Sequence, residues 1–147
     1  MNEMEKLCFE VIQIAKDAGD FIRNELLHRE EIKPEVKGRH NYVTYVDKSA
    51  EEQLVEKLKP LLPDAGFITE EGTNKTKGKI YNWIIDPLDG TTNYIHGLPP
   101  FAVSVALMKE DKIVLGVIYE IGLDECFYAW QGGGAFLNGK KIVTSKI

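Results

Sequence analysis

Two aspartates, three positions apart, carry the clearest chemical signal in the sequence. They enclose a proline and a leucine in the segment Asp86–Asp89, which follows an apolar run and precedes Gly90. Pro87 fixes its φ at about −65°. Gly90 tolerates backbone angles that other residues avoid, so the chain can turn tightly here. In such a turn both carboxylates and the Leu88 carbonyl converge, and hard cations such as Mg²⁺ prefer this set of oxygen ligands.

A second pair of acids, Glu70 and Glu71, follows another apolar run at residues 66–69. If that run lies beside the one ending at Asp86, Glu70 adds a third carboxylate to the same edge of a sheet. Three clustered carboxylates repel one another unless cations lie among them. The alternative is that Asp86–Asp89 is simply good turn chemistry, since Asp, Pro and Gly are common in turns for local reasons. The neighbouring glutamates favour the metal-binding interpretation.

The residues after the second aspartate add an expected anion site. The amides of Gly90, Thr91 and Thr92 would open a short helix, and a helix N-terminus is a ready site for phosphate. Metals held by carboxylates beside an amide cradle form the arrangement used in metal-assisted hydrolysis of phosphate esters. The sequence therefore indicates this chemistry for the segment.

With these residues in view, the chain resembles the inositol monophosphatase family of Mg²⁺-dependent, often lithium-sensitive phosphatases. The matching segments occur in the family's order and span nearly the whole chain: Val43–Asp47, Glu70-Glu71, Asp86–Gly97, Pro100-Phe101 and Gly132–Gly139. The resemblance implies hydrolysis of inositol monophosphate, or of a related small sugar or polyol phosphate, by a metal-activated water. It also implies a homodimer and the first half of the family's layered α/β fold.

The resemblance assigns metal ligands residue by residue. Glu70, Asp86 and the Leu88 carbonyl resemble the ligands of the first Mg²⁺ ion, and Asp86 and Asp89 resemble ligands of the second. Glu70 thereby counts among the catalytic residues as well. For Glu71 two interpretations stay open, a role in metal binding and a solvated acid beside the ligand.

The resemblance also assigns the groups that act on water and substrate. Asp47 and the Thr91 hydroxyl resemble the pair that orients and helps deprotonate the attacking water, a general-base role. Lys37 resembles a residue of the mobile loop that folds over the site and helps bring in a further metal. The residues that resemble the phosphate-binding group are Asp89, Gly90, Thr91 and Thr92.

The match covers only the first half of the family's length. Family members carry a second half of similar size, with a Trp-Asp-x-x-x-Gly motif whose Asp completes the second metal site, and nothing here matches that motif. A long sheet with two helices also leaves one face without cover. We therefore expect residues 1–147 to be a single N-terminal domain, cut short or completed by a partner. The alternative function is a catalytically impaired metal-binding module that needs a partner or the missing C-terminal half.

The elements that must position these residues follow from hydrophobic periodicity. Apolar residues recur at helical spacing over residues 4–28. The β-branched and aromatic segment Asn41–Val46 predicts a strand, and Asp47 or Ser49 would cap a second helix. Later apolar runs, with a hairpin signal at Asn138-Gly139, predict strands at 66–69, 81–86, 101–109, 113–120, 126–131, 135–137 and 141–144. We expect an α+β fold with two N-terminal helices packed on a largely antiparallel sheet.

The composition of the sequence limits the classes of partner that the protein is expected to bind. The 18 Lys and Arg against 23 Asp and Glu give a net charge of −5, which argues against non-specific nucleic-acid binding. Cys8 and Cys126 predict buried, reduced thiols. The first residues are acidic rather than basic, and the longest apolar run is far shorter than the ~20 residues that cross a membrane. We therefore expect a cytoplasmic protein that binds a small phosphate monoester, and neither nucleic acid nor membrane.

Overall fold

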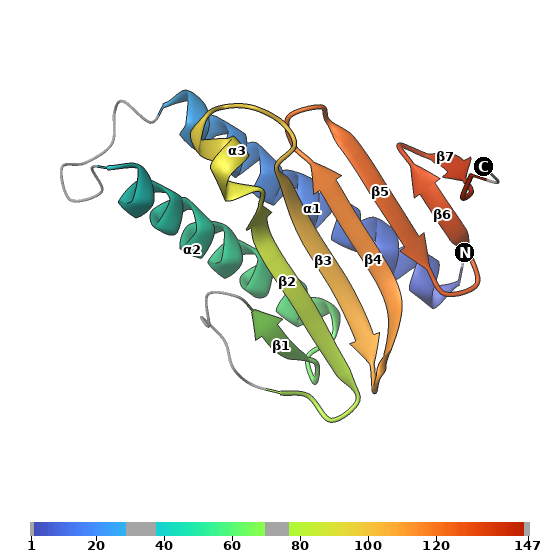
Figure 1. Cartoon of the computed structure of the whole chain (residues 1–147). Coiled ribbons are helices and arrows are strands. Elements are labelled where there is room, and N and C mark those ends of the chain that lie inside the picture. The colour runs from blue at the N-terminus through green and yellow to red at the C-terminus, as the bar shows by residue number, and fades with distance from the viewer. Residues whose placement is uncertain (1, 29–37, 70–76, 146–147) are drawn as a thin grey trace.

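The computed structural model of the chain describes residues 2–28, 38–69 and 77–145. Two long helices lie along one face of a seven-stranded sheet (Figure 1). This arrangement confirms the predicted α+β class. Of the described helices, none combines the length and apolarity that crossing a membrane requires. The elements in chain order are α1 (Glu3–Leu27), α2 (Arg39–Leu58), η3 (Lys59–Leu61), β1 (Gly66–Thr69), β2 (Tyr81–Asp89), α3 (Thr91–Ile95), β3 (Ala102–Lys109), β4 (Lys112–Glu120), β5 (Glu125–Trp130), β6 (Gly134–Leu137) and β7 (Lys140–Ile142).

The strands lie in the sheet in the same order as in the chain. The β1–β2 pair is parallel, and each later pair is antiparallel, as the predicted meander requires. The last hairpin turns at Asn138 and Gly139, whose φ values of 49° and 86° suit a two-residue hairpin loop. Because parallel strands end at the same edge of a sheet, the β1–β2 pair brings the residues after both strands to one side.

Helix α1 begins at a side-chain cap and buries one stripe against the sheet. The Glu5 N–H donates to the Asn2 side-chain oxygen at 2.7 Å, which satisfies one of the first-turn donors of the helix. The buried side chains of α1 pack on β3, β4 and β5 in one core. Each large aliphatic side chain buried there contributes about 1.5–3 kcal/mol. The stripe consists of Cys8, Val11, Ala15, Ala18 and Ile22.

The predicted strand at Asn41–Val46 is wrong, because these residues belong to α2, which begins at Arg39 after Gly38. Asp47 and Ser49 do not cap a helix either, since both lie inside α2. Buried residues at four-residue spacing explain the difference. Their packing outweighs the local β preference of a segment rich in Tyr, Val and Thr. The stripe consists of Tyr42, Val46, Ala50, Leu54 and Leu58.

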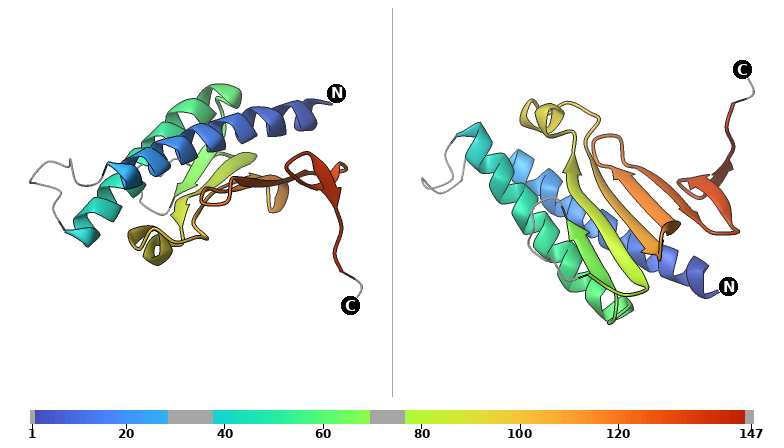
Figure 2. Two further views of the ribbon diagram at one scale, coloured as in Figure 1. Left: turned by 90° about the horizontal axis from the view of Figure 1, so that it is seen from above. Right: turned by 60° about the horizontal axis from the view of Figure 1, so that its bottom comes forward.

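The opposite face of the sheet carries no long helix in the part of the chain that the structure describes (Figure 2, left). Apolar side chains are exposed on it: Ile118 is 49% exposed and Phe127 is 36% exposed. Both side chains line a groove of about 280 Å³, together with small residues that include Ser104, Ala106, Gly116 and Ala129. Sheets normally bury an apolar face against another layer, so this face has the composition of an internal surface.

Candidate active site

A β-bulge in β2 places the two predicted metal-binding aspartates on the same face of the sheet. Asp86 pairs with Ser104 of β3 and Asp89 pairs with Ala102, so three steps along β2 match two steps along β3. Residues three apart in a regular strand point to opposite faces, whereas the extra residue of a bulge restores a common face. The predicted turn is therefore replaced by a bulged strand that continues to Asp89.

The segment between the two acids is anchored in the core. Pro87 and Leu88 are buried, while Asp86 is half-buried and Asp89 is exposed. The Oδ1 atom of Asp86 has no contact with solvent. Oxygen donors held on one face of a rigid strand suit a hard cation such as Mg²⁺, and two carboxylates so placed favour a cation between them. The described residues thus supply part of the donor set that the sequence predicts, and the third predicted carboxylate, Glu70, lies outside them.

Gly90 turns the chain from β2 into α3. It adopts the left-handed conformation, with φ 87° and ψ 40°, and a Cβ at this position would lie 2.6 Å from the Pro100 carbonyl oxygen. The Tyr94 N–H donates to the Gly90 carbonyl at 3.0 Å. The N–H groups of Thr91 and Thr92 lie in the first turn, where no helical acceptor is available. The predicted short helix thus begins where expected, with Thr91 half-buried and Thr92 exposed.

Tyr94 fixes α3 to the two long helices. Its side chain is fully buried, and its hydroxyl donates to the Ile22 carbonyl of α1 at 3.1 Å. Its ring stacks on Tyr42 of α2, with centroids 6.3 Å apart, and meets Phe101 edge-on at 5.4 Å. Because these contacts come from three directions, the Gly90–Thr92 turn has a defined position relative to α1 and α2.

Asp47 lies in the first half of α2, which packs against β2 and contacts α3. Its side chain is buried, and its Oδ1 atom has no contact with solvent. One helical turn later, Glu51 is fully buried, on the same face as Asp47. Glu51 is not among the residues predicted from the sequence, because Asp47 was expected at the start of a helix. The spacing of four between two acids was the available signal.

Three of the predicted site residues lie outside the described part of the chain: Lys37, Glu70 and Glu71. The described end of β1 is Thr69, which pairs with Ile85 in the parallel register. Strand β1 therefore ends beside the residue that precedes Asp86, as the hypothesis of a shared sheet edge requires. Among residues 2–28, 38–69 and 77–145, no group of three or more His, Cys, Asp and Glu side chains is placed to hold a metal ion.

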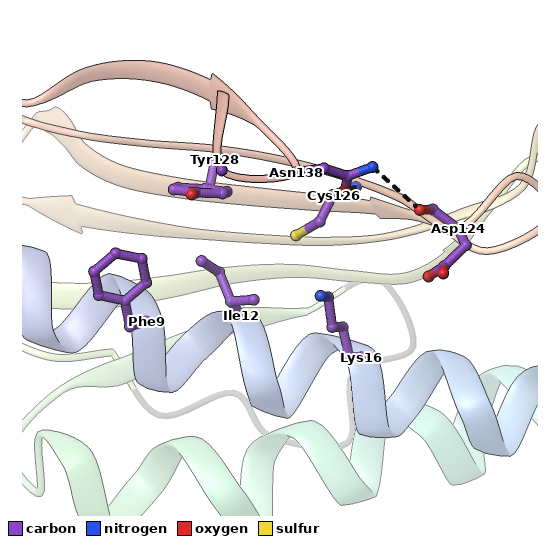
Figure 3. Close-up of a pocket in the computed structure, with 8 residues that line it drawn as sticks. Phe9, Ile12, Lys16, Asp124, Cys126, Tyr128 and Asn138 are labelled. Atoms are coloured by element: carbon purple, nitrogen blue, oxygen red, sulfur yellow. Dashed lines mark hydrogen bonds between the residues drawn. The ribbon is translucent and has the colours of Figure 1, made fainter. Parts of the chain in front are cut away.

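A separate pocket of about 310 Å³ lies between α1 and β5 (Figure 3). Burial raises the pKa of the Cys126 thiol, and the ammonium group of Lys16 opposes that shift. A protonated thiol is a poor nucleophile. None of the predicted site residues is among the described residues that line this pocket, so the pocket is distinct from the candidate site. The lining residues are Phe9, Ile12, Lys16, Asp124, Cys126, Tyr128, Asn138 and Gly139.

Comparison with known proteins decides the family. A sequence model of the inositol monophosphatase family matches residues 3–146. The chain belongs to the inositol monophosphatase family. Inositol monophosphatase 2 of Solanum lycopersicum is 43% identical over 147 residues, which cover 97% of this chain and 55% of that protein. A protein of Aquifex aeolicus named fructose-1,6-bisphosphatase/inositol-1-monophosphatase is 41% identical, and the aligned region covers 97% of this chain and 54% of that protein.

Solved structures agree with the family assignment. The inositol monophosphatase of Anabaena (Nostoc) sp. superposes with a TM-score of 0.83 at 30% identity, over 99% of this chain and 52% of that one. The chain thus spans about half the length of the curated relatives and solved structures that it matches. The shared part of the family fold is the layer of two helices and the sheet described above.

Proposed function

We propose that the chain serves Mg²⁺-dependent hydrolysis of a phosphate monoester, with inositol monophosphate or a related small sugar or polyol phosphate as the substrate. The supporting observation is the β2 bulge, which holds Asp86 and Asp89 on one face directly before the Gly90 turn. Family membership supports phosphatase chemistry. The names of the relatives support an inositol phosphate as the substrate. The name of the Aquifex aeolicus protein also supports a sugar bisphosphate as a member of the proposed substrate class.

The proposed metal ligands are Glu70, Asp86, Asp89 and the Leu88 carbonyl. When bound, Mg²⁺ would neutralise phosphate charge and lower the pKa of water. The protein's own contribution is a fixed arrangement of oxygen donors, because the buried Pro87 and Leu88 hold the segment between the aspartates. A rigid donor set loses less conformational entropy on binding than a flexible one.

The proposed base is Asp47, which accepts a proton from the attacking water while the Thr91 hydroxyl orients that water. The N–H groups of Gly90, Thr91 and Thr92 bind the phosphate oxygens. The contacts that support this arrangement are the packing of α2 on β2 and the anchoring of α3 through Tyr94. No covalent phospho-enzyme is part of the proposal.

We propose that residues 1–147 act as an N-terminal domain, with a second half supplied by the same or another polypeptide. The relatives' twofold length and the apolar open face of the sheet support this proposal. The alternative is a metal-binding module that does not turn over substrate by itself. A homodimer and lithium inhibition stay predictions from the resemblance, and a cytoplasmic location stays a prediction from the composition of the sequence.

Release of inorganic phosphate from inositol monophosphate tests the proposal. The chain is assayed with Mg²⁺, with EDTA and as the Asp89→Asn variant, beside Asp111→Asn as a matched control in the exposed β3–β4 turn. The proposal expects phosphate release that EDTA and Asp89→Asn abolish and that Asp111→Asn preserves. Release that survives EDTA or Asp89→Asn contradicts it. Mg²⁺ binding without phosphate release favours the alternative module.

A further inference from the structure

Glu120, the last residue of β4, is a buried acid that the proposed mechanism does not use. Its side chain is 7% exposed. Its Oε1 atom accepts hydrogen bonds from the Phe101 and Gly122 N–H groups, each at 3.1 Å, and its Oε2 atom accepts one from the Leu123 N–H at 2.5 Å. The ion pairs of the described residues do not include Glu120. Three backbone amides therefore stabilise its carboxylate, as charge-assisted hydrogen bonds do.

The three amides belong to two different loops. Phe101 ends the loop between α3 and β3, whereas Gly122 and Leu123 form the turn between β4 and β5. The loops also meet directly, because the Ile121 N–H donates to the Phe101 carbonyl at 2.9 Å. A Cβ on Gly122 would lie 2.9 Å from the Pro99 side chain. Glu120 thus joins the two loops at a point where the backbones approach closely.

The loop held by Glu120 is also the surface on which the Gly90 turn rests. The Asn93 side-chain amide donates to the Pro100 carbonyl at 2.9 Å, and the Leu98 N–H donates to the Asn93 carbonyl at 2.9 Å. The Pro100 oxygen and the Phe101 Cα fill the space beside Gly90. In the sheet, Ala102 pairs with Asp89 on one side and with Glu120 on the other.

We propose that Glu120 is a positioning residue for the candidate site: its carboxylate fixes the backbone of Pro100 and Phe101, and that backbone fixes the turn that follows Asp89. Glu120 touches neither Asp86 nor Asp89 in this account and acts through the intervening loop. The consequence for metal binding rests on the proposed function, whereas the consequence for the turn does not. The same carboxylate also ties the turn to the β4–β5 connection, which begins two strands away from β2 in the sheet.

Amide hydrogen exchange in wild type, Glu120→Ala and Glu120→Gln tests the proposal. Glutamine keeps one acceptor oxygen, so it can retain the Phe101 bond and lose the Leu123 bond. A lost hydrogen bond to a charged acceptor is expected to raise exchange by about tenfold or more. The alanine variant should show this at Phe101 and also at Tyr94 and Leu98, which Glu120 does not contact. The glutamine variant should lie between alanine and wild type.

Two controls separate positioning from general loss of stability. Glu125, which pairs with Glu120 across the β4–β5 ladder, has no side-chain hydrogen bond within the described part of the chain, and Glu125→Ala should leave exchange at Tyr94 unchanged. The Gln131 N–H, bonded to Val114, should stay protected in each Glu120 variant. Equal acceleration at Tyr94 and Gln131, or acceleration at Phe101 with none at Tyr94, overturns the proposal.

A second readout follows the effect to the metal site. Mn²⁺ affinity, measured by calorimetry, should fall by about tenfold in Glu120→Ala, because the turn loses the stabilisation that one hydrogen bond provides. The affinity should recover in part in Glu120→Gln. Unchanged affinity in the alanine variant contradicts the link to the site. If wild type binds no Mn²⁺, the proposed function fails, while the exchange data still decide the role of Glu120. If the alanine variant does not fold, the glutamine variant decides both.

Discussion

Replacement of Gly90 by alanine is expected to destabilise the folded state of the chain. Two features of the position cause this. Its φ of 87° lies in the left-handed region, which costs an L-residue about 1–2 kcal/mol. The new Cβ would also lie 2.6 Å from the Pro100 oxygen and 3.2 Å from the Phe101 Cα, and these are backbone atoms that cannot rotate away.

The expected magnitude is the sum of these two effects. Overpacking in a fixed environment costs about 1–3 kcal/mol, so Gly90→Ala should lower the free energy of unfolding by about 2–5 kcal/mol. That is a large share of the roughly 5–15 kcal/mol available to a single domain. Gly97 supplies the matched control, because its φ is 70° and, its chain neighbours aside, the described residues place no atom within 4 Å of a Cβ built on it. Gly97→Ala should therefore cost only about 1–2 kcal/mol.

Urea denaturation followed by circular dichroism measures both variants against wild type. The midpoint should shift more for Gly90→Ala than for Gly97→Ala, with similar denaturant slopes if both unfold as wild type does. Equal shifts would mean that the contact with Pro100 has no energetic consequence. That result would refute the argument that the loop before β3 supports the turn.

Three further predictions concern single polar side chains. Tyr94→Phe removes the hydrogen bond to the Ile22 carbonyl and should lower the free energy of unfolding by about 1–2 kcal/mol in urea. Asn138→Ala removes the acceptor of the Cys126 N–H and places alanine at φ 49°, so a loss of about 2–3 kcal/mol is expected by the same method. Burial, with a smaller effect of Cys126, raises the pKa of the Cys8 thiol from 9.0 to about 12. Between those two pH values the unfolded state loses its thiol proton and the folded state keeps it. The free energy of unfolding should therefore be constant below pH 9 and fall between pH 9 and pH 12, and this fall should be smaller in Cys8→Ala. Parallel pH profiles of wild type and Cys8→Ala would contradict this prediction.

Sequence patterns located the sheet well because its strands are short apolar runs separated by turn residues. The predicted run at 66–69 coincides with β1, and the Asn138-Gly139 hairpin lies where its positive φ values require. In both cases the local signal and the tertiary environment agree. Local chemistry is then sufficient to find the element.

The error at Asn41–Val46 arose because two periods fit the same residues. Tyr42 and Val46 are separated by four positions, which suits one face of a strand as well as one face of a helix. Only the continuation of the spacing through Ala50 and Leu54 distinguishes the two. The burial of this stripe against β2 is a tertiary effect that a six-residue window does not contain.

The sequence proposes residues for the candidate site but does not determine how they are arranged. The types and spacing of Asp86, Asp89 and Gly90 indicated oxygen donors followed by a turn, and the structure places them at the end of one strand. The bulge that returns both aspartates to one face depends on pairing with Ser104 and Ala102. No feature of the segment alone determines that register, because the partner strand lies more than ten residues later.

The most direct test of the account is the affinity for Mg²⁺ of wild type, Asp86→Asn and Asp89→Asn, measured by isothermal titration calorimetry. We expect saturable binding in wild type, its loss in Asp86→Asn, whose carboxylate is assigned to both ions, and weaker binding in Asp89→Asn, whose carboxylate is assigned to the second ion. Asp111→Asn, altered in the exposed β3–β4 turn, should bind as wild type does. Wild-type affinity in both Asp86→Asn and Asp89→Asn would contradict the account.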